Sequence, residues 1–145
     1  GAGNILIYEG KDGFILVDDQ WEDVKPTIDK MLKSISNKPV LYVLNTHFHF
    51  DHTDGNMAFG KQGIKIIAHD NLRKRLLTEQ HVAPPSDVYQ KAYPFNALPS
   101  ITFSDSLTLH EEKEAIKIFH VLKVNSLKYK RANYFIRMSH WNAPY

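Results

Sequence analysis

Four side chains that can bind a metal ion lie within one short stretch of the chain. They are His47, His49, Asp51 and His52, which form the pattern H-x-H-x-D-H. Imidazole nitrogen and carboxylate oxygen are ligands that zinc binds readily. A single histidine in a loop is ordinarily a polar surface residue, and short motifs also match by chance. Four ligand-type residues at this spacing instead favour a metal site that could activate water.

The residues around the motif indicate how it could be presented. It follows an apolar run, Val40–Leu44, which predicts a buried strand ending at a sheet edge. In an extended segment residues i and i+2 point the same way, so His47, His49 and Asp51 would share one side. His52 would point elsewhere unless the chain turns, and residues 53–55 supply a turn. One segment could then offer two ligand pairs to two metal ions roughly 3.5–4 Å apart, which can hold a hydroxide between them.

Size and composition are those of one soluble domain, which we predict to span residues 1–145. The 145 residues are 43% hydrophobic and 23% charged, with a net charge of +2, so charge alone implies no nucleic-acid or membrane partner. The chain contains no cysteine, which excludes thiolate ligands and disulfides. No apolar run approaches the ~18 residues that span a bilayer. No leader pattern is visible, which leaves the compartment open between periplasm and cytoplasm.

The first half of the chain alternates strand and helix patterns. Two apolar runs separated by turn residues predict a hairpin, and helical spacing of apolar residues follows. The expected elements are strands over 4–8, 14–17, 40–45 and 64–68 and helices over 22–36, 56–59 and 70–79.

The second half is rich in strand patterns. Residues 80–100 contain four prolines and predict a long irregular loop, of a kind that is often functional. Its Tyr89, Tyr93 and Phe95 could line a pocket, but anchoring the loop to the core is the interpretation we prefer. The expected strands are 101–103, 107–109, 115–120, 127–130 and 134–138, with a polar turn at 111–114. The order predicts a mixed α/β fold with helices on one face of the sheet and a second face that must be buried against something.

The segment Thr46–Gly55 resembles the signature of the metallo-β-lactamase fold superfamily. The similarity extends to Phe14–Gln20 and to Ile64–Asp70, and covers roughly residues 4–120. The resemblance implies the first half of an αβ/βα sandwich and a zinc-dependent hydrolase. The lack of cysteine fits the subclass of zinc β-lactamases whose second site uses Asp, His and His.

The resemblance also implies roles for individual residues. His47 and His49 match ligands of a first zinc ion, and Asp51 and His52 match ligands of a second. Asp51 would also act in catalysis by orienting the attacking water. Asp18 matches an aspartate that orients metal ligands, although a plain strand-end turn is an equal explanation for Asp18 and Asp19.

The chain departs from the family's pattern after His120. The family has a third histidine ligand shortly after that position, in a segment like H-T-D-G-D, but residues 121–127 read VLKVNSL. A bridging aspartate is also expected where this chain has Ile136–His140, and the chain ends well short of the family's usual length. We therefore expect a truncated or degenerate member that lacks the second-half ligands. Further ligands from outside the motif could come from His69, His81, His110, His120 and His140. For any one of these we favour the simpler interpretation of an ordinary surface or half-buried histidine.

Two functions follow. The first is a zinc-dependent hydrolase in which metal-bound hydroxide attacks a lactam, lactone, thioester or phosphodiester of a small-molecule substrate. The alternative is a catalytically impaired metal-binding or oligomerising remnant of the fold. A half-fold with a bare apolar sheet face predicts a homodimer that completes the sandwich. The basic residues of the tail, such as Lys128 and Arg131, fit a solvated sheet edge, so we expect no nucleic-acid partner.

Overall fold

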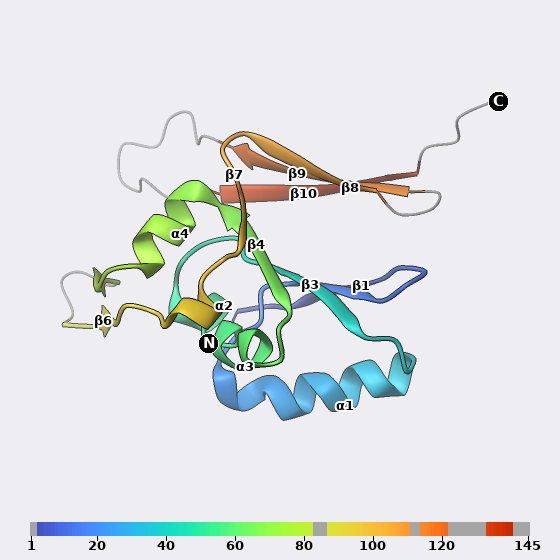
Figure 1. Ribbon diagram of the computed structural model, residues 1–145, viewed down its shortest axis with the longest axis horizontal. Helices are drawn as coiled ribbons and strands as arrows, with labels where there is room; N and C mark the ends of the chain where they lie inside the picture. Colours follow the sequence, from blue (N-terminus) through green and yellow to red (C-terminus); the bar gives the residue numbers. More distant parts are fainter. Residues whose placement is uncertain (1–2, 83–86, 111–113, 122–132, 141–145) are drawn as a thin grey trace.

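The computed structural model describes residues 3–82, 87–110, 114–121 and 133–140. It has three layers: helices, a five-stranded sheet, and a second sheet of three strands (Figure 1). This arrangement confirms the predicted mixed α/β class with helices on one face of the central sheet.

The central sheet places the carboxyl ends of four parallel strands at one edge. Its strands run in the order β1-β2-β3-β4-β7, with only β1 antiparallel to its neighbour. Asp18 follows β2, the histidine motif follows β3, and His69 ends β4. Segments distant in sequence therefore converge at this edge. The bounds are Leu6–Glu9 for β1, Phe14–Val17 for β2, Val40–Leu44 for β3, Lys65–His69 for β4 and Ile101–Phe103 for β7.

Helices α1 (Lys25–Ile35) and α3 (Asn56–Lys61) cover one face of this sheet. The predicted helix over 22–36 begins as a 3-10 turn, η1 (Glu22–Val24), and becomes α-helical just before Pro26, which the first turn tolerates. The apolar side chains that the helices and the sheet bury together are Phe14, Leu16, Ile28, Leu32, Val43, Phe59 and Ile66.

The opposite face of the central sheet is covered by strands of the same chain. The strands β8 (Ser106–His110), β9 (Glu114–Val121) and β10 (Asn133–His140) form an antiparallel sheet with β9 in the middle. Ile116 and Ile118 of β9 are buried against the central sheet, in a cluster completed by Ile15, Leu44, Ile67 and Phe103. The apolar face that we expected a second copy to cover is thus covered here by β8 and β9.

The predicted loop over 80–100 contains regular structure that the sequence did not reveal. A short antiparallel pair, β5 (Gln80–His81) with β6 (Tyr89–Gln90), is followed by the 3-10 turn η2 (Phe95–Ala97). Tyr93 is buried and anchors this segment against helix α4 (Asp70–Leu76), as the interpretation that we preferred requires. Tyr89 and Phe95 do not anchor it, because they are 54% and 85% exposed. The strand predicted over 127–130 lies outside the described residues.

No helix in the described part of the chain combines the length and apolar character needed to cross a bilayer.

Candidate metal centre

The backbone at the end of β2 and β3 brings Asp18 beside the start of the histidine motif. The two strands pair in parallel with Val17 opposite Leu44, and the Asp18 amide donates to the Leu44 carbonyl at 2.7 Å. Asp18 then adopts a left-handed conformation, with φ of 61°. Aspartate is among the residues that tolerate this conformation. The turn places its carboxylate next to Thr46.

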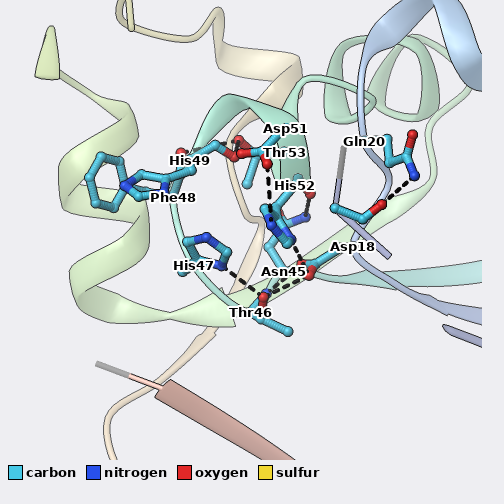
Figure 2. A network of polar contacts seen from close by, with 11 residues as sticks. Asp18, Gln20, Asn45, Thr46, His47, Phe48, His49, Asp51, His52 and Thr53 are labelled. Atoms are coloured by element: carbon cyan, nitrogen blue, oxygen red, sulfur yellow. Dashed lines mark hydrogen bonds and ion pairs between the residues drawn. The ribbon is translucent and has the colours of Figure 1, made fainter. Parts of the chain in front are cut away.

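The Asp18 carboxylate accepts three hydrogen bonds from the motif and its flank. Oδ1 accepts from the backbone amide of Thr46 at 2.7 Å, and Oδ2 accepts from Thr46 Oγ1 at 2.7 Å and from His52 Nδ1 at 2.8 Å (Figure 2). The side chain is 6% exposed. A buried carboxylate with three donors is held firmly, so it fixes the groups that donate to it.

This network assigns the tautomers of two histidines. The Thr46 hydroxyl directs its single proton to Asp18, so it accepts a hydrogen bond from His47 Nδ1, which lies 3.0 Å from Thr46 Oγ1. His52 Nδ1 donates directly to Asp18. Both rings therefore carry a proton on Nδ1, and Nε2 is the nitrogen left to bind a metal ion.

The electrostatics of the two rings differ. Burial lowers the pKa of His47 to about 4, and the nearby His52 contributes to this shift. The hydrogen bond to Asp18 raises the pKa of His52 above its ordinary value. At neutral pH His47 is therefore in the neutral form that binds metal ions, and ion binding at His52 must displace any proton held there.

The side chains that lie close enough to share an ion are Asp18, His47 and His52. One ligand atom from each lies within 4.8 Å of the others. The ring centroids of His47 and His52 are 4.0 Å apart. Because Asp18 already accepts three hydrogen bonds, its geometry suits orienting the two imidazoles more than coordinating an ion itself. The donor set and its protonation fit a zinc ion.

His49 and Asp51 lie outside that group of three. The ring of His49 packs edge-on against His47 with centroids 4.8 Å apart, and Asp51 Oδ2 lies 3.6 Å from His52 Nε2. The expectation that Asp51 continues the alternation of an extended strand is wrong. The chain turns into helix α2 (Phe50–Thr53) three residues before the predicted turn, so Asp51 and His52 are helical. Which of the four motif side chains bind metal stays a prediction.

A residue that sequence reasoning missed is Thr46. Its hydroxyl joins Asp18 to His47, and the signal for it was only its place between a buried strand and the first histidine.

The carboxylate of Asp19, beside Asp18 in the chain, is also unusual. Asp19 is fully buried, and neither of its oxygens has a hydrogen-bond partner among the described residues. Burial, together with the neighbouring Asp18 and Asp54, raises the pKa of Asp19 well above its ordinary value.

The outside histidines divide into those with described contacts and those without. His69 donates from Nε2 to the Ser104 carbonyl at 2.7 Å and accepts from the Asn71 amide at Nδ1, so both ring nitrogens are engaged. Its ring lies beside that of His120, with centroids 4.1 Å apart. His81 stacks on Tyr89. His110 is exposed at the end of β8, and the side chain of His140 is outside the described structure.

Comparison with known proteins identifies the kind of fold to which this site belongs. A family model described as the Metallo-beta-lactamase superfamily matches residues 1–121. The solved structure of the metallo-β-lactamase MIM-1 from Novosphingobium pentaromativorans is similar with a TM-score of 0.66 and 17% identity over 92% of this chain. A metallo-β-lactamase from Cronobacter sakazakii with a HARLDQ motif is similar with a TM-score of 0.63 and 14% identity over 81% of this chain.

The chain is also similar in sequence to curated proteins. A linear primary-alkylsulfatase from a Pseudomonas species is 30% identical in an alignment 94 residues long, which covers 60% of this chain and 18% of that protein. The two solved structures are matched over 52% and 45% of their own chains. This chain therefore spans about half the length of the metallo-β-lactamases it matches and a smaller part of the alkylsulfatase.

Proposed function

Because this chain belongs to the metallo-β-lactamase superfamily, we propose that it is a zinc-dependent hydrolase whose metal centre is built on the H-x-H-x-D-H motif. The proposed ligands are His47, His49, Asp51 and His52, for one or two zinc ions. The proposed substrate is a small molecule with a lactam, lactone, thioester or phosphodiester bond. The alkylsulfatase similarity adds an alkyl sulfate ester to the classes worth testing.

The observation that supports this proposal most directly is the orientation of two imidazoles by one carboxylate. Asp18 holds His52 by its Nδ1 proton and holds His47 through Thr46, so both rings offer Nε2 for coordination. A histidine on a solvent-exposed loop does not need a partner that fixes its second ring nitrogen. Metal-binding histidines usually have such a partner. His47 is also neutral at physiological pH, as a ligand must be.

The residues of the motif have complementary tasks in the proposed reaction. Zinc, when bound, lowers the pKa of water and polarises a carbonyl or phosphoryl oxygen. In this proposal Asp51 orients the attacking water and accepts a proton at its carboxylate, a role that the 3.6 Å distance from its Oδ2 to His52 Nε2, a proposed ligand atom, supports. Asp18 and Thr46 keep the imidazoles from rotating. Phe50, next to Asp51 in the chain, packs at a tilt against Trp21, with ring centroids 4.8 Å apart, and gives the neighbourhood of Asp51 an apolar side.

Zinc content and hydrolysis together test the proposal. The purified protein should retain zinc after dialysis, lose it to a chelator, and hydrolyse at least one of a chromogenic cephalosporin, a lactone, a thioester, a phosphodiester or an alkyl sulfate. His47→Ala should remove both properties. His81→Ala is the matched control, because His81 is exposed and stacks on Tyr89. A protein that binds no zinc contradicts the proposal.

The alternative is a metal-binding or oligomerising remnant without turnover. It is favoured by residues 121–127, which lack the third-histidine segment. Residues 122–132 lie outside the described structure. Bound zinc with no hydrolysis on the whole panel would support this alternative. The homodimer stays a prediction. The bare sheet face that was its physical reason is covered by β8 and β9 of the same chain, and sedimentation would test it.

A further inference from the structure

Gln90 lies far from the histidine motif in sequence and yet contacts its backbone. Its side-chain Nε2 donates to the carbonyl of Phe48 at 2.7 Å across a separation of 42 residues. We propose that Gln90 is a positioning residue for the metal ligands, which holds in place the peptide group that joins Phe48 to His49. This inference rests on the proposed function, because it concerns the same metal site.

Only the NH2 half of the Gln90 amide has a hydrogen-bond partner among the described residues, and that partner is the Phe48 carbonyl. Gln90 is 4% exposed, and its Oε1 is buried without a hydrogen-bond partner in the part of the chain that the structure describes. Burying a polar oxygen without a partner is unfavourable, and an apolar side chain of equal size would avoid it. The orientation of the amide is fixed because a carbonyl can only accept, so the NH2 group faces Phe48. The donor is therefore the functional half of the side chain.

Phe48 is the residue through which two histidines can be oriented at once. Its carbonyl belongs to the peptide that joins Phe48 to His49, so holding this oxygen restricts the backbone torsions on both sides of that peptide. The rings of His47 and His49 pack edge-on with centroids 4.8 Å apart. A rotated peptide would change the direction of His49 relative to His47. Metal ligands need such geometry within narrow limits.

The other donor near this carbonyl cannot replace Gln90. Thr53 Oγ1 lies 3.2 Å from the Phe48 carbonyl and 3.1 Å from the His49 carbonyl, and it also contacts the hydroxyl of Tyr93 at 2.8 Å. Tyr93 directs its own proton to Asp54 Oδ1 at 2.5 Å. The single hydroxyl proton of Thr53 is thus shared among three acceptors. The Gln90 amide, by contrast, donates to the Phe48 carbonyl without competition from these acceptors.

The ring of Phe48 is held from the same side of the molecule. The guanidinium of Arg75, on helix α4, lies 4.6 Å from the ring centroid. Arg75 also donates to Gln80 Oε1, at 3.3 Å, on strand β5 of the same hairpin as Gln90. Helix α4 and strand β6 therefore contact Phe48, the first at its ring and the second at its carbonyl. This gives these two elements a task in building the metal site.

Gln80 provides a matched control for Gln90. The two glutamines face each other in the β5–β6 pair, so they share residue type and hairpin. Gln80 differs in its contacts: its Nε2 donates to the carbonyl and hydroxyl of Thr78, and only its Oε1, which accepts from Arg75, is connected to Phe48. A purely structural role of the hairpin would make both positions equally sensitive. A positioning role makes the metal site sensitive to Gln90 alone.

The experiment compares Gln90→Met, Gln90→Leu and Gln80→Glu with the wild-type protein. Zinc affinity is measured by competition with a chromophoric chelator, ligand geometry by the visible absorption bands of the Co²⁺ form, and folding by thermal unfolding without metal. Gln90→Met should weaken zinc binding about tenfold, the usual effect of losing a group that orients ligands, and should alter the Co²⁺ bands. Gln90→Leu also removes the donor and leaves a shorter apolar side chain, so it should act in the same way if Gln90→Met fails to fold. Gln80→Glu keeps the acceptor oxygen for Arg75 and loses only the donor to Thr78, so it should leave affinity and spectrum unchanged.

The outcomes separate this inference from the proposed function. Wild-type protein that binds no zinc defeats the proposed function and the inference with it. Wild-type protein that binds zinc, with Gln90 variants of unchanged affinity and spectrum, defeats the inference and leaves the proposed function standing. Equal losses in the Gln90 and Gln80 variants also overturn the inference, because they would indicate a general effect of the hairpin.

Discussion

Asp18 Oδ2 and His52 Nδ1 lie 2.8 Å apart, although 34 residues separate them in the chain. The contact joins the end of β2 to helix α2 and determines which nitrogen of His52 faces the metal site. It depends on the left-handed backbone at Asp18, which turns the carboxylate back toward the motif. The same carboxylate reaches His47 through Thr46. One side chain outside the motif therefore orients two of its histidines.

The first prediction concerns this carboxylate. Asp18→Asn keeps a residue that tolerates the left-handed backbone, and removes the charge that holds the Nδ1 proton of His52. We expect zinc affinity to fall 10- to 100-fold, or about 1.4 to 2.8 kcal/mol, as for other groups that orient metal ligands. Chelator competition measures the loss. Asp23→Asn is the control, because Asp23 is exposed on η1. Unchanged zinc affinity in Asp18→Asn would remove Asp18 from the site.

The motif and its flanking strands could be predicted because their signals are local. A buried strand followed by four ligand-type residues identified the sheet edge, and the resemblance assigned Asp18 an orienting role that its hydrogen bonds now explain. The helical turn at Phe50 could not be foreseen, since the alternating pattern over 47–51 also fits a strand. The contact of Gln90 with Phe48 leaves no local trace, because it depends on how a hairpin packs against a distant loop.

The second prediction concerns the pH dependence of stability. Asp19 is buried beside Asp18 and Asp54, and burial raises the pKa of its carboxyl in the folded protein well above the ordinary value of 3.8. An acid with a raised folded pKa binds its proton more tightly in the folded state. Its stabilising contribution is therefore complete below pH 3.8 and is lost as the pH rises from there through the folded pKa.

Asp19→Asn should remove this part of the pH dependence. The free energy of unfolding, from urea titrations of metal-free protein at several pH values, should fall less steeply with rising pH in the variant than in the wild type. Burial also raises the pKa of Asp54, but both proteins contain Asp54, so the difference between them isolates Asp19. Parallel pH profiles for the two proteins would show that Asp19 ionises normally in the folded state.

The third prediction concerns the packing of α3 against η2. A Cβ on Gly60 would lie 1.9 Å from the Asn96 carbonyl oxygen, so Gly60→Ala must push the two elements apart. We expect a loss of about 1–3 kcal/mol, typical of overpacking, in urea unfolding. Gly63 is the contrasting site: nothing lies within 4 Å of its Cβ position, but its φ is +78°. Asparagine tolerates that conformation, so Gly63→Asn should cost much less than Gly60→Asn. Equal costs would contradict the packing argument.

The fourth prediction concerns access to His52 Nε2. A Cβ on Gly3 would lie 2.8 Å from this nitrogen and 2.7 Å from the Asp51 carbonyl oxygen, so the chain at Gly3 passes directly against the ring. Gln20 Nε2 donates to the Gly3 carbonyl and holds this segment there. In Gly3→Ala one of the two partners must move. The ring is held by the buried Asp18, whereas residue 3 precedes β1 and is held by a side chain that is itself partly exposed.

We therefore expect the segment to yield and not the ring. Gly3→Ala should bind zinc faster in stopped-flow measurements, because Nε2 becomes more accessible, with a change in unfolding free energy within about 0.5 kcal/mol, as for other substitutions outside the core. Gln20→Asn is the matched variant: asparagine tolerates the left-handed φ of 56° at this position but is too short to reach Gly3, so it should release the same segment and speed zinc binding likewise. Slower zinc binding in Gly3→Ala, with normal rates in Gln20→Asn, would mean that the added methyl group displaces the imidazole, and that the hydrogen bond to Asp18 is too weak to hold His52 in place.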